Sequence, residues 1–155
     1  MKTLILYASK HGTTKDTAMK INEYLKNSDV YDIQKEEIKN LQDYDCVILG
    51  SALYAGNIIK KAKDFLKENE TQLLEKKLGF FLCGLNSDGG ESYFSKNFNK
   101  TLLDRASMTR FIGGKFDLKE LNLLERTIMK LLYKDADSAN TISEDKIEEF
   151  CNGMR

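Results

Sequence analysis

The stretch Leu4-Ile5-Leu6-Tyr7-Ala8-Ser9-Lys10-His11-Gly12-Thr13-Thr14 decides the fold of this chain. Its first part, residues 4–7, is an uninterrupted apolar run, which is typical of a parallel strand buried on both faces. Three hydroxyl side chains and one glycine follow within six residues, and apolar residues then recur at helical spacing from Ala18. A strand, a hydroxyl-rich turn and a helix N-terminus gather free backbone N–H groups around one point, which favours binding of a phosphate group.

The same hydroxyls allow an interpretation without a ligand. Thr13 or Thr14 could accept a hydrogen bond from the first turn of the helix and act as an ordinary N-cap. The stretch by itself leaves both interpretations open.

Length and composition indicate one globular domain. A chain of 155 residues is long enough to bury a full core, and 41% hydrophobic with 31% charged residues is typical of a globular protein. The 24 basic residues balance the 24 acidic ones, so no large field of either sign attracts polyanions. We therefore expect no nucleic-acid partner.

Further features predict a cytoplasmic protein. No apolar run approaches the ~18 residues that span a bilayer, and the N-terminus leads into the first strand without a signal-peptide pattern. The three cysteines, Cys46, Cys83 and Cys151, are odd in number and lack the spacing of metal ligands. We expect reduced thiols, a cytoplasmic location and no metal site.

Apolar segments recur in an order that predicts an α/β fold. Strands are expected over 4–7, 30–33, 46–50, 78–83 and 111–114. Helices are expected over about 13–26, 58–66, 93–103 and 118–133, with a closing helix through 147–150 that Thr141 and Ser143 can cap. Because strands and helices alternate, we expect a parallel sheet covered by helices on both faces.

Three loops of unusual composition follow the carboxyl ends of strands one, three and four, where open parallel sheets bind ligands. The first is the hydroxyl-rich loop 9–14. The second, 51–57, places Tyr54 among small residues, and the third, 84–90, contains three glycines whose bare backbone can approach a planar ligand closely. A phosphate clamp, an aromatic platform and backbone hydrogen-bond partners together suit a mononucleotide with a large flat ring.

Competing phosphate sites are excluded by residues that the chain lacks. It contains neither G-x-x-x-x-G-K-S/T, the loop of nucleotide hydrolases, nor G-x-G-x-x-G after the first strand, the dinucleotide signature. A response-regulator receiver needs acidic residues after strands one and three, where Ser9, Lys10 and Ser51 stand. A low-molecular-weight phosphatase needs a cysteine and an arginine bracketing the first loop, and neither is there. A flavin nucleotide remains.

Two motifs carry a resemblance to the flavodoxin family. Residues 9–14 resemble its phosphate loop, T-x-T-G-x-T, with serine at the first position, and residues 50–56 resemble its second loop, G-S-P-T-Y-x-G, with Ala52 where proline is common. The likeness runs nearly the whole chain and is closest to the flavodoxin-like protoporphyrinogen oxidases of bacteria. It includes the start of the chain, the run 128–131, and a leucine-rich segment from about Lys115 to Asn140 that is similar to the long insertion of those oxidases.

The resemblance implies a flavodoxin-like three-layer α/β/α sandwich whose five-stranded parallel sheet has the order 2-1-3-4-5. Residues 1–155 would form a single domain that binds FMN, with a helical insertion at about 115–140. The phosphate would be held by Ser9, Lys10, His11, Gly12, Thr13 and Thr14. One side of the isoalloxazine would be lined by Ser51, Ala52, Leu53, Tyr54, Ala55 and Gly56. The other side would be formed by Cys83, Gly84, Leu85, Asn86, Gly89 and Gly90.

Several side chains near these loops have plainer interpretations. Tyr54 is expected to be exposed and to stack on the ligand. His11 is expected to face solvent rather than transfer protons, and Cys83 to be a buried structural thiol. The stripe at 118, 121, 124, 128, 131 and 132 is expected to dock a helix on the domain, with a homodimer or membrane-surface contact through Leu118–Tyr133 as the alternative.

By resemblance, the chain is expected to be an FMN-dependent oxidoreductase with a small-molecule or protein redox partner, similar to protoporphyrinogen oxidase. An electron-transfer flavodoxin is the first alternative, although shuttling flavodoxins are strongly acidic and this chain is neutral. A flavodoxin-fold module that binds or dimerises without turnover is the second. The sequence predicts no catalytic residue.

Overall fold

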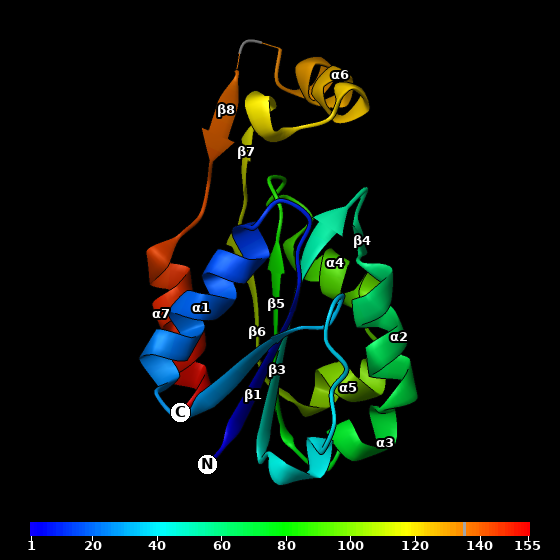
Figure 1. Ribbon diagram of the computed structural model, residues 1–155, viewed down its shortest axis with the longest axis vertical. Coiled ribbons are helices and arrows are strands. Elements are labelled where there is room, and N and C mark those ends of the chain that lie inside the picture. The colour runs from blue at the N-terminus through cyan, green and yellow to red at the C-terminus, as the bar shows by residue number, and fades with distance from the viewer. Residues whose placement is uncertain (135) are drawn as a thin grey trace.

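Five parallel strands form the central sheet of this computed structural model, which describes residues 1–134 and 136–155 (Figure 1). In spatial order they are β2 (Ser28–Asp32), β1 (Thr3–Ala8), β3 (Cys46–Tyr54), β5 (Lys77–Cys83) and β6 (Ala106–Gly113). A short sixth strand, β4 (Asn57–Ile58), pairs antiparallel with the end of β3. Numbered among themselves, the five parallel strands have the order 2-1-3-4-5, so the predicted sheet is confirmed.

Helices cover both faces of the sheet, which makes three layers (Figure 1). One face carries α1 (Thr13–Leu25) and α7 (Glu144–Met154). The other carries α2 (Lys60–Glu68), α3 (Glu70–Leu73), α4 (Gly90–Asn97) and α5 (Lys100–Arg105), together with the short 3₁₀ turn η1 (Leu41–Asp43).

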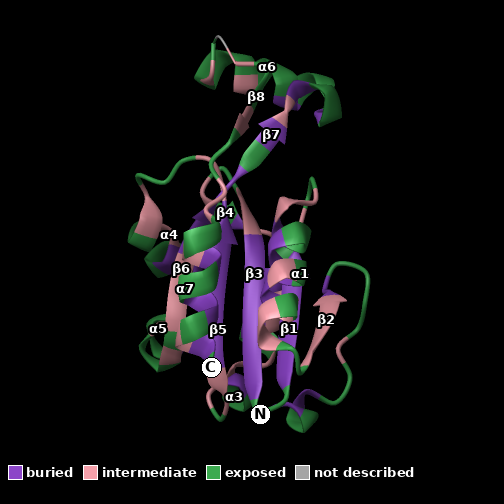
Figure 2. Ribbon diagram, turned by 90° about the vertical axis from the view of Figure 1, so that its left-hand side faces the viewer, coloured by how far each residue is buried: buried purple, intermediate pink, exposed green. Residues whose placement is uncertain are grey.

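The core follows from the continuous apolar strands. All of β1 is buried, and Figure 2 shows the buried residues running along the centre of the sheet. Alternate residues face opposite sides, so Leu4 and Leu6 enter one hydrophobic cluster while Ile5 and Tyr7 enter the other. Gly50 makes room for Phe81 across the strands, because a Cβ on Gly50 would lie 1.9 Å from that ring. Both faces are therefore packed, as a parallel sheet requires.

Some predicted elements have different bounds. The strands expected over 46–50 and 111–114 extend to 46–54 and 106–113. The helix expected over 93–103 is two helices, because Phe98 is extended and the Asn99 side chain caps α5 by accepting from Leu102 N at 2.8 Å. Ser143 caps α7 as predicted, but Thr141 does not cap it.

Residues 115–140 form a separate lobe above the carboxyl end of the sheet (Figures 1 and 2). The lobe comprises β7 (Lys115–Asp117), η2 (Leu118–Glu120), α6 (Leu123–Leu132) and β8 (Ser138–Asn140); Asp135, within the predicted insertion, lies outside the described residues. Its two connections to the body meet closely: Thr141 N donates to Gly114 O at 2.7 Å. Gly113 has φ +112°, and a Cβ there would lie 2.1 Å from Thr141 O, so this junction requires glycine.

The helix predicted over 118–133 begins later than expected. Asn122 and Glu125 form a capping box that starts α6 at Leu123. Leu118 and Leu121 are buried in the small core of the lobe with Phe116. The docking prediction was wrong for the rest of the stripe, because Leu124, Leu131 and Leu132 are between 67% and 71% exposed and Ile128 is 41% exposed. No helix in the described part of the chain is long and apolar enough to cross a membrane.

Candidate functional site

A cavity of about 510 Å³ lies where the three predicted loops meet the lobe. This volume is typical of sites for cofactors and small ligands. From the predicted loops it is lined by Ser9, Lys10, His11, Thr13, Thr14, Ala52, Leu53, Tyr54, Ala55, Gly56, Cys83, Gly84, Leu85 and Asn86. Four further predicted residues, Gly12, Ser51, Gly89 and Gly90, lie outside this lining. The topology thus brings all three loops to one place, as the position of the strand ends predicted.

The first loop leads from β1 into α1 without a side-chain cap. Gly12 is the N-cap residue with φ +89°, a conformation that favours glycine, and its N–H donates to Ser9 Oγ at 3.0 Å. The N-cap interpretation of Thr13 and Thr14 is therefore wrong. Thr14 lines the cavity. Its hydroxyl is buried and has no hydrogen-bond partner among the described residues. A buried hydroxyl without a partner costs free energy unless a ligand satisfies it.

The two basic side chains of the first loop contact the lobe. Lys10 Nζ pairs with Glu125 Oε1, and His11 Nε2 lies 3.3 Å from the same oxygen. The Lys10 ammonium also lies 4.2 Å from the centroid of the Tyr54 ring. The hydrogen bond from Lys10 lowers the pKa of Glu125, and the same bond raises the pKa of Lys10. Both groups are charged at neutral pH and connect lobe and loop.

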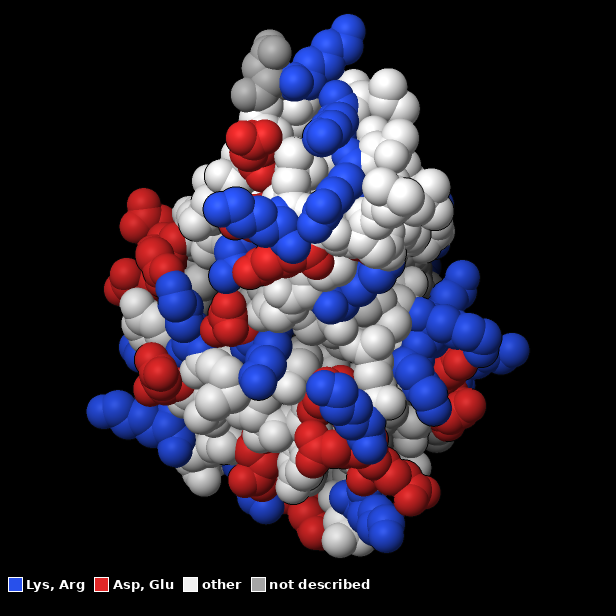
Figure 3. All heavy atoms as spheres, turned by 45° about the horizontal axis from the view of Figure 1, so that its top comes forward, with Lys and Arg blue, Asp and Glu red and all other residues white. Residues whose placement is uncertain are grey.

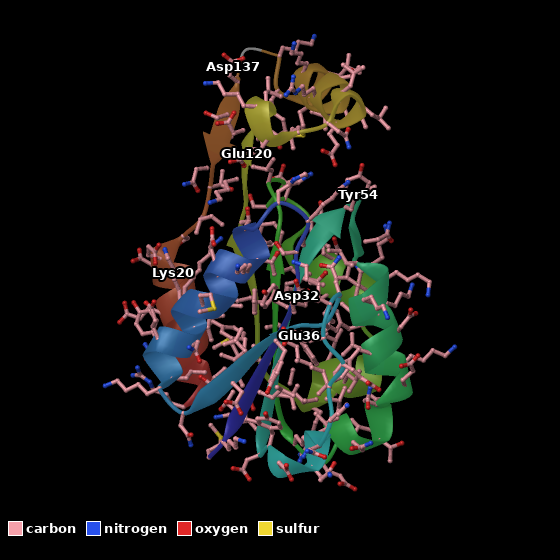
Figure 4. All side chains as sticks on the ribbon, viewed as in Figure 1. Lys20, Asp32, Glu36, Tyr54, Glu120 and Asp137 are labelled. Atoms are coloured by element: carbon pink, nitrogen blue, oxygen red, sulfur yellow. The ribbon has the colours of Figure 1, made fainter. Side chains whose placement is uncertain are left out.

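The second loop is a tight hairpin rather than an open loop. Tyr54 pairs with Asn57, and the two residues between them, Ala55 and Gly56, have φ +49° and +74°, as in a type I′ turn. This turn leaves Tyr54 51% exposed at the edge of the cavity (Figure 4). Ser51 has a structural role instead: its hydroxyl accepts from Ile59 N at 3.0 Å.

The third loop contributes its first half to the cavity. Cys83 ends β5 and is buried, and burial raises the pKa of its thiol to about 11, so it is protonated and unreactive at neutral pH. Gly89 and Gly90 instead begin α4. A Cβ on Gly89 would lie 2.4 Å from the Tyr93 ring, so this glycine allows Tyr93 to reach the cavity wall.

The upper wall of the cavity was not predicted as part of the site. The lobe contributes Lys115, Phe116, Leu121, Glu125, Ile128, Met129, Leu132 and Tyr133 to this wall, and the body adds the unpredicted lining residues Ile59, Tyr93 and Gly114. The Asn-x-x-Glu capping signature at 122–125 could have located the start of α6. Nothing in its local sequence shows that this helix faces the loops, because that placement depends on contacts across the fold.

The chain is similar in sequence to known proteins of the flavodoxin type. A family model described as a flavodoxin domain matches residues 4–142. The chain is 24% identical to the protoporphyrinogen IX dehydrogenase (quinone) of Escherichia coli strain K12, in an alignment covering 100% of the chain and 93% of that protein. It is 34% identical over 97 residues to a flavodoxin of Clostridium saccharobutylicum, covering 59% of the chain and 61% of that protein.

Solved structures agree with the family model. Oxidised flavodoxin 1 from Bacillus cereus superimposes with a TM-score of 0.63 at 18% identity, covering 99% of this chain and 95% of that one. A flavoprotein from Lactobacillus acidophilus NCFM, solved in complex with FMN, has a TM-score of 0.53 at 22% identity, covering 73% and 91%. Because the family model spans most of the sequence and the sheet has the matching order, the chain belongs to the flavodoxin family.

Proposed function

We propose that this protein binds FMN in the cavity and acts as an FMN-dependent oxidoreductase. The observation that carries the proposal is the buried Thr14 hydroxyl without a partner, in the first turn of α1 beside the cavity. A phosphate oxygen at this point would accept from Thr14 and from free N–H groups at the start of the helix, where the helix dipole also favours negative charge. Loop 9–14 is thus chemically suited to the phosphate.

The remaining loops suit the flavin ring. Tyr54 offers an aromatic face. The backbone from Gly84 to Asn86 offers hydrogen-bond donors and acceptors, and Gly84 has no side chain to keep a ligand away from it. When bound, FMN supplies the electron or hydride chemistry. The protein residues bind and orient the ring, and the lobe restricts access of water from above.

The lobe favours an enzyme over a simple electron carrier. Apolar side chains of α6, including Ile128, Met129 and Leu132, line the cavity opposite the three loops. A wall of this kind suits a bulky, largely apolar substrate lying against the ring. Flavodoxin-like proteins transfer electrons to redox partners, and the similar Escherichia coli protein is named as a protoporphyrinogen IX dehydrogenase. We infer that the protein acts on a substrate of the porphyrinogen class. We also infer that it works in the cytoplasm, where reducing conditions suit its three free cysteines.

The test is a titration of the apo-protein with FMN, followed by flavin fluorescence. Thr14→Val should weaken FMN binding by about 1.5–3 kcal/mol, the range for hydrogen bonds to charged groups. It should not lower the free energy of unfolding of the apo-protein and should raise it slightly, because valine removes a buried hydroxyl that has no partner. Thr17→Val is the matched control: its hydroxyl donates to Thr13 O at 3.0 Å, so this change should lower stability and spare FMN binding. A protein that does not bind FMN would refute the proposal.

We further propose that the exposed face of α6 contacts an anionic membrane surface. Leu124 and Leu131 are exposed on α6, Lys130 precedes Leu131 in the same helix, and Lys134 follows two residues after the helix ends. Figure 3 shows basic side chains over the top of the lobe next to an uncharged area. Apolar and basic residues on one helix are typical of helices that lie in a membrane interface.

Sedimentation with vesicles tests this contact. The protein should sediment with vesicles that contain anionic lipid and less with neutral ones, and Leu124→Ser/Leu131→Ser should abolish sedimentation. A concentration-dependent dimer in size exclusion, lost in the same variant and without vesicle binding, would show that a second copy covers this face instead.

A further inference from the structure

Glu125 joins the lobe to the loop that we assign to the FMN phosphate. Its side chain is only 6% exposed, although it carries a charge. One carboxylate oxygen accepts from Lys10 and lies 3.3 Å from His11 Nε2, while the other accepts from Asn122 N at 3.1 Å. A buried carboxylate with this set of partners is fixed in place rather than solvated.

These contacts engage both side chains of the phosphate loop that can carry a positive charge. Lys10 and His11 are the only residues between 9 and 14 that can carry a positive charge, and both contact the same Glu125 oxygen. A phosphate in this loop would be a second anion next to the Lys10 ammonium and the His11 ring. Like charges that share one set of counter-ions disfavour each other, most strongly where the groups are shielded from water.

We propose that Glu125 is a latch that competes with the FMN phosphate for Lys10 and His11. The inference rests on the proposed FMN site. Coupling between two sites is reciprocal. If Glu125 weakens phosphate binding by some factor, then a phosphate that contacts Lys10 and His11 weakens the contact between α6 and the loop by the same factor. The latch holds the lobe over the cavity while the site lacks its cofactor, and bound FMN loosens it so that a second ligand can enter.

Glu125→Gln is a clean test of the latch. Glutamine also serves at this position of a capping box, so α6 keeps its N-terminus while the negative charge is lost. Glu120→Gln is the matched control, since Glu120 is an exposed carboxylate of the same lobe (Figure 4). Riboflavin, which has the ring but no phosphate, separates phosphate effects from ring effects.

Two readouts are expected to change together. Glu125→Gln should bind FMN more tightly by roughly fivefold or more, the low end of typical coupling factors, with riboflavin affinity unchanged. In the unaltered protein, amide hydrogen exchange in α6 should be faster with FMN bound than with riboflavin bound, and this difference should vanish in Glu125→Gln. Glu120→Gln should behave as the unaltered protein in both experiments.

The latch and the proposed function fail in different ways. Equal effects of Glu125→Gln on FMN and riboflavin, or weaker FMN binding, would refute the competition while leaving the FMN site intact. If neither flavin binds, the proposed function fails, and the latch is then judged on the apo-protein. There, α6 amides must exchange faster in Glu125→Gln than in Glu120→Gln, and equal exchange rates would overturn the latch.

Discussion

Tyr54 is the last residue of β3 before the β3–β4 turn, and half of its surface is exposed at the edge of the cavity. We expect Tyr54→Ala to weaken FMN binding by ~1–3 kcal/mol, the range for stacking of aromatic side chains on nucleobases. Fluorescence titration of the apo-protein measures this loss. Tyr54→Phe keeps the ring and should retain most of the affinity.

The Lys10 ammonium already lies over this ring, so truncation of Tyr54 also removes a cation–π contact. Riboflavin controls for this effect, since loss of stacking should weaken both flavins equally. FMN affinity that is unchanged in Tyr54→Ala would exclude Tyr54 from the ring site.

Single residues show how far motifs alone can identify a site. The hydroxyl loop and Tyr54 could be singled out because their residue types are unusual after a buried strand. The roles of individual residues could not be predicted from the motifs. Gly12, not a threonine, is the N-cap of α1, and the Ser51 hydroxyl accepts from the backbone N–H of Ile59. Such roles depend on φ angles and distant N–H groups that a motif does not specify. Tyr93 reaches the cavity only because Gly89 leaves space beside it.

At the scale of elements, α6 is attached to the body through an ionised carboxylate. Because Lys10 lowers the pKa of Glu125 in the folded protein, its ionisation stabilises the folded state. This contribution is complete above the ordinary carboxyl value of 4.5 and is lost as the pH falls through the lowered folded value. The groups that face Glu125 are Lys10, His11 and the backbone of Asn122.

We therefore expect the stability difference between the unaltered protein and Glu125→Gln to depend on pH. Urea unfolding near neutral pH should show the glutamine variant to be less stable, and the two curves should converge at acidic pH below the ordinary carboxyl value. A difference that persists unchanged into acid would mean that packing of the side chain, rather than its charge, stabilises the lobe.

Periodicity predicted that most elements exist but not where they end. Apolar spacing placed a helix within 118–133 and another within 93–103. The observed boundaries come from Asn122 and Asn99, whose side chains cap α6 and α5. Asparagine is common in loops and turns as well as at caps, so Asn99 alone does not locate the start of α5, whereas the Asn-x-x-Glu signature at 122–125 could have located the start of α6.

At the scale of the whole molecule, the body was predictable and the position of the lobe was not. Buried strands alternating with helices restrict the body to few topologies, and the family motifs select one. The lobe is placed by close backbone contacts between segments distant in sequence. A Cβ on Gly114 would lie 2.6 Å from the Gly84 carbonyl carbon, and Gly113 contacts Thr141 in the same way. In the sequence, a close backbone contact of this kind is visible only as a glycine. Glycines also occur for many other reasons, so they do not reveal the contact.

We propose that residues 1–155 form one domain in which the lobe is an insertion. Removal of the lobe tests this proposal. The lobe has its own small core of Phe116, Leu118 and Leu121, separate from the two clusters on the sheet faces. Its two ends meet where Thr141 N donates to Gly114 O at 2.7 Å. A short Asn-Gly linker from Gly114 to Thr141 can therefore replace residues 115–140 without moving either end.

We expect this shortened chain to unfold cooperatively in urea, with a smaller m-value because less surface is buried in the folded state. It should still bind FMN through loop 9–14 and should discriminate FMN from riboflavin more strongly than the full chain, since Glu125 is gone and Lys10 and His11 are free for the phosphate. Its binding to anionic vesicles should be lost with α6. If the shortened chain does not unfold cooperatively, residues 115–140 are an integral part of the domain, and the body depends on the Leu85 contact with the lobe core.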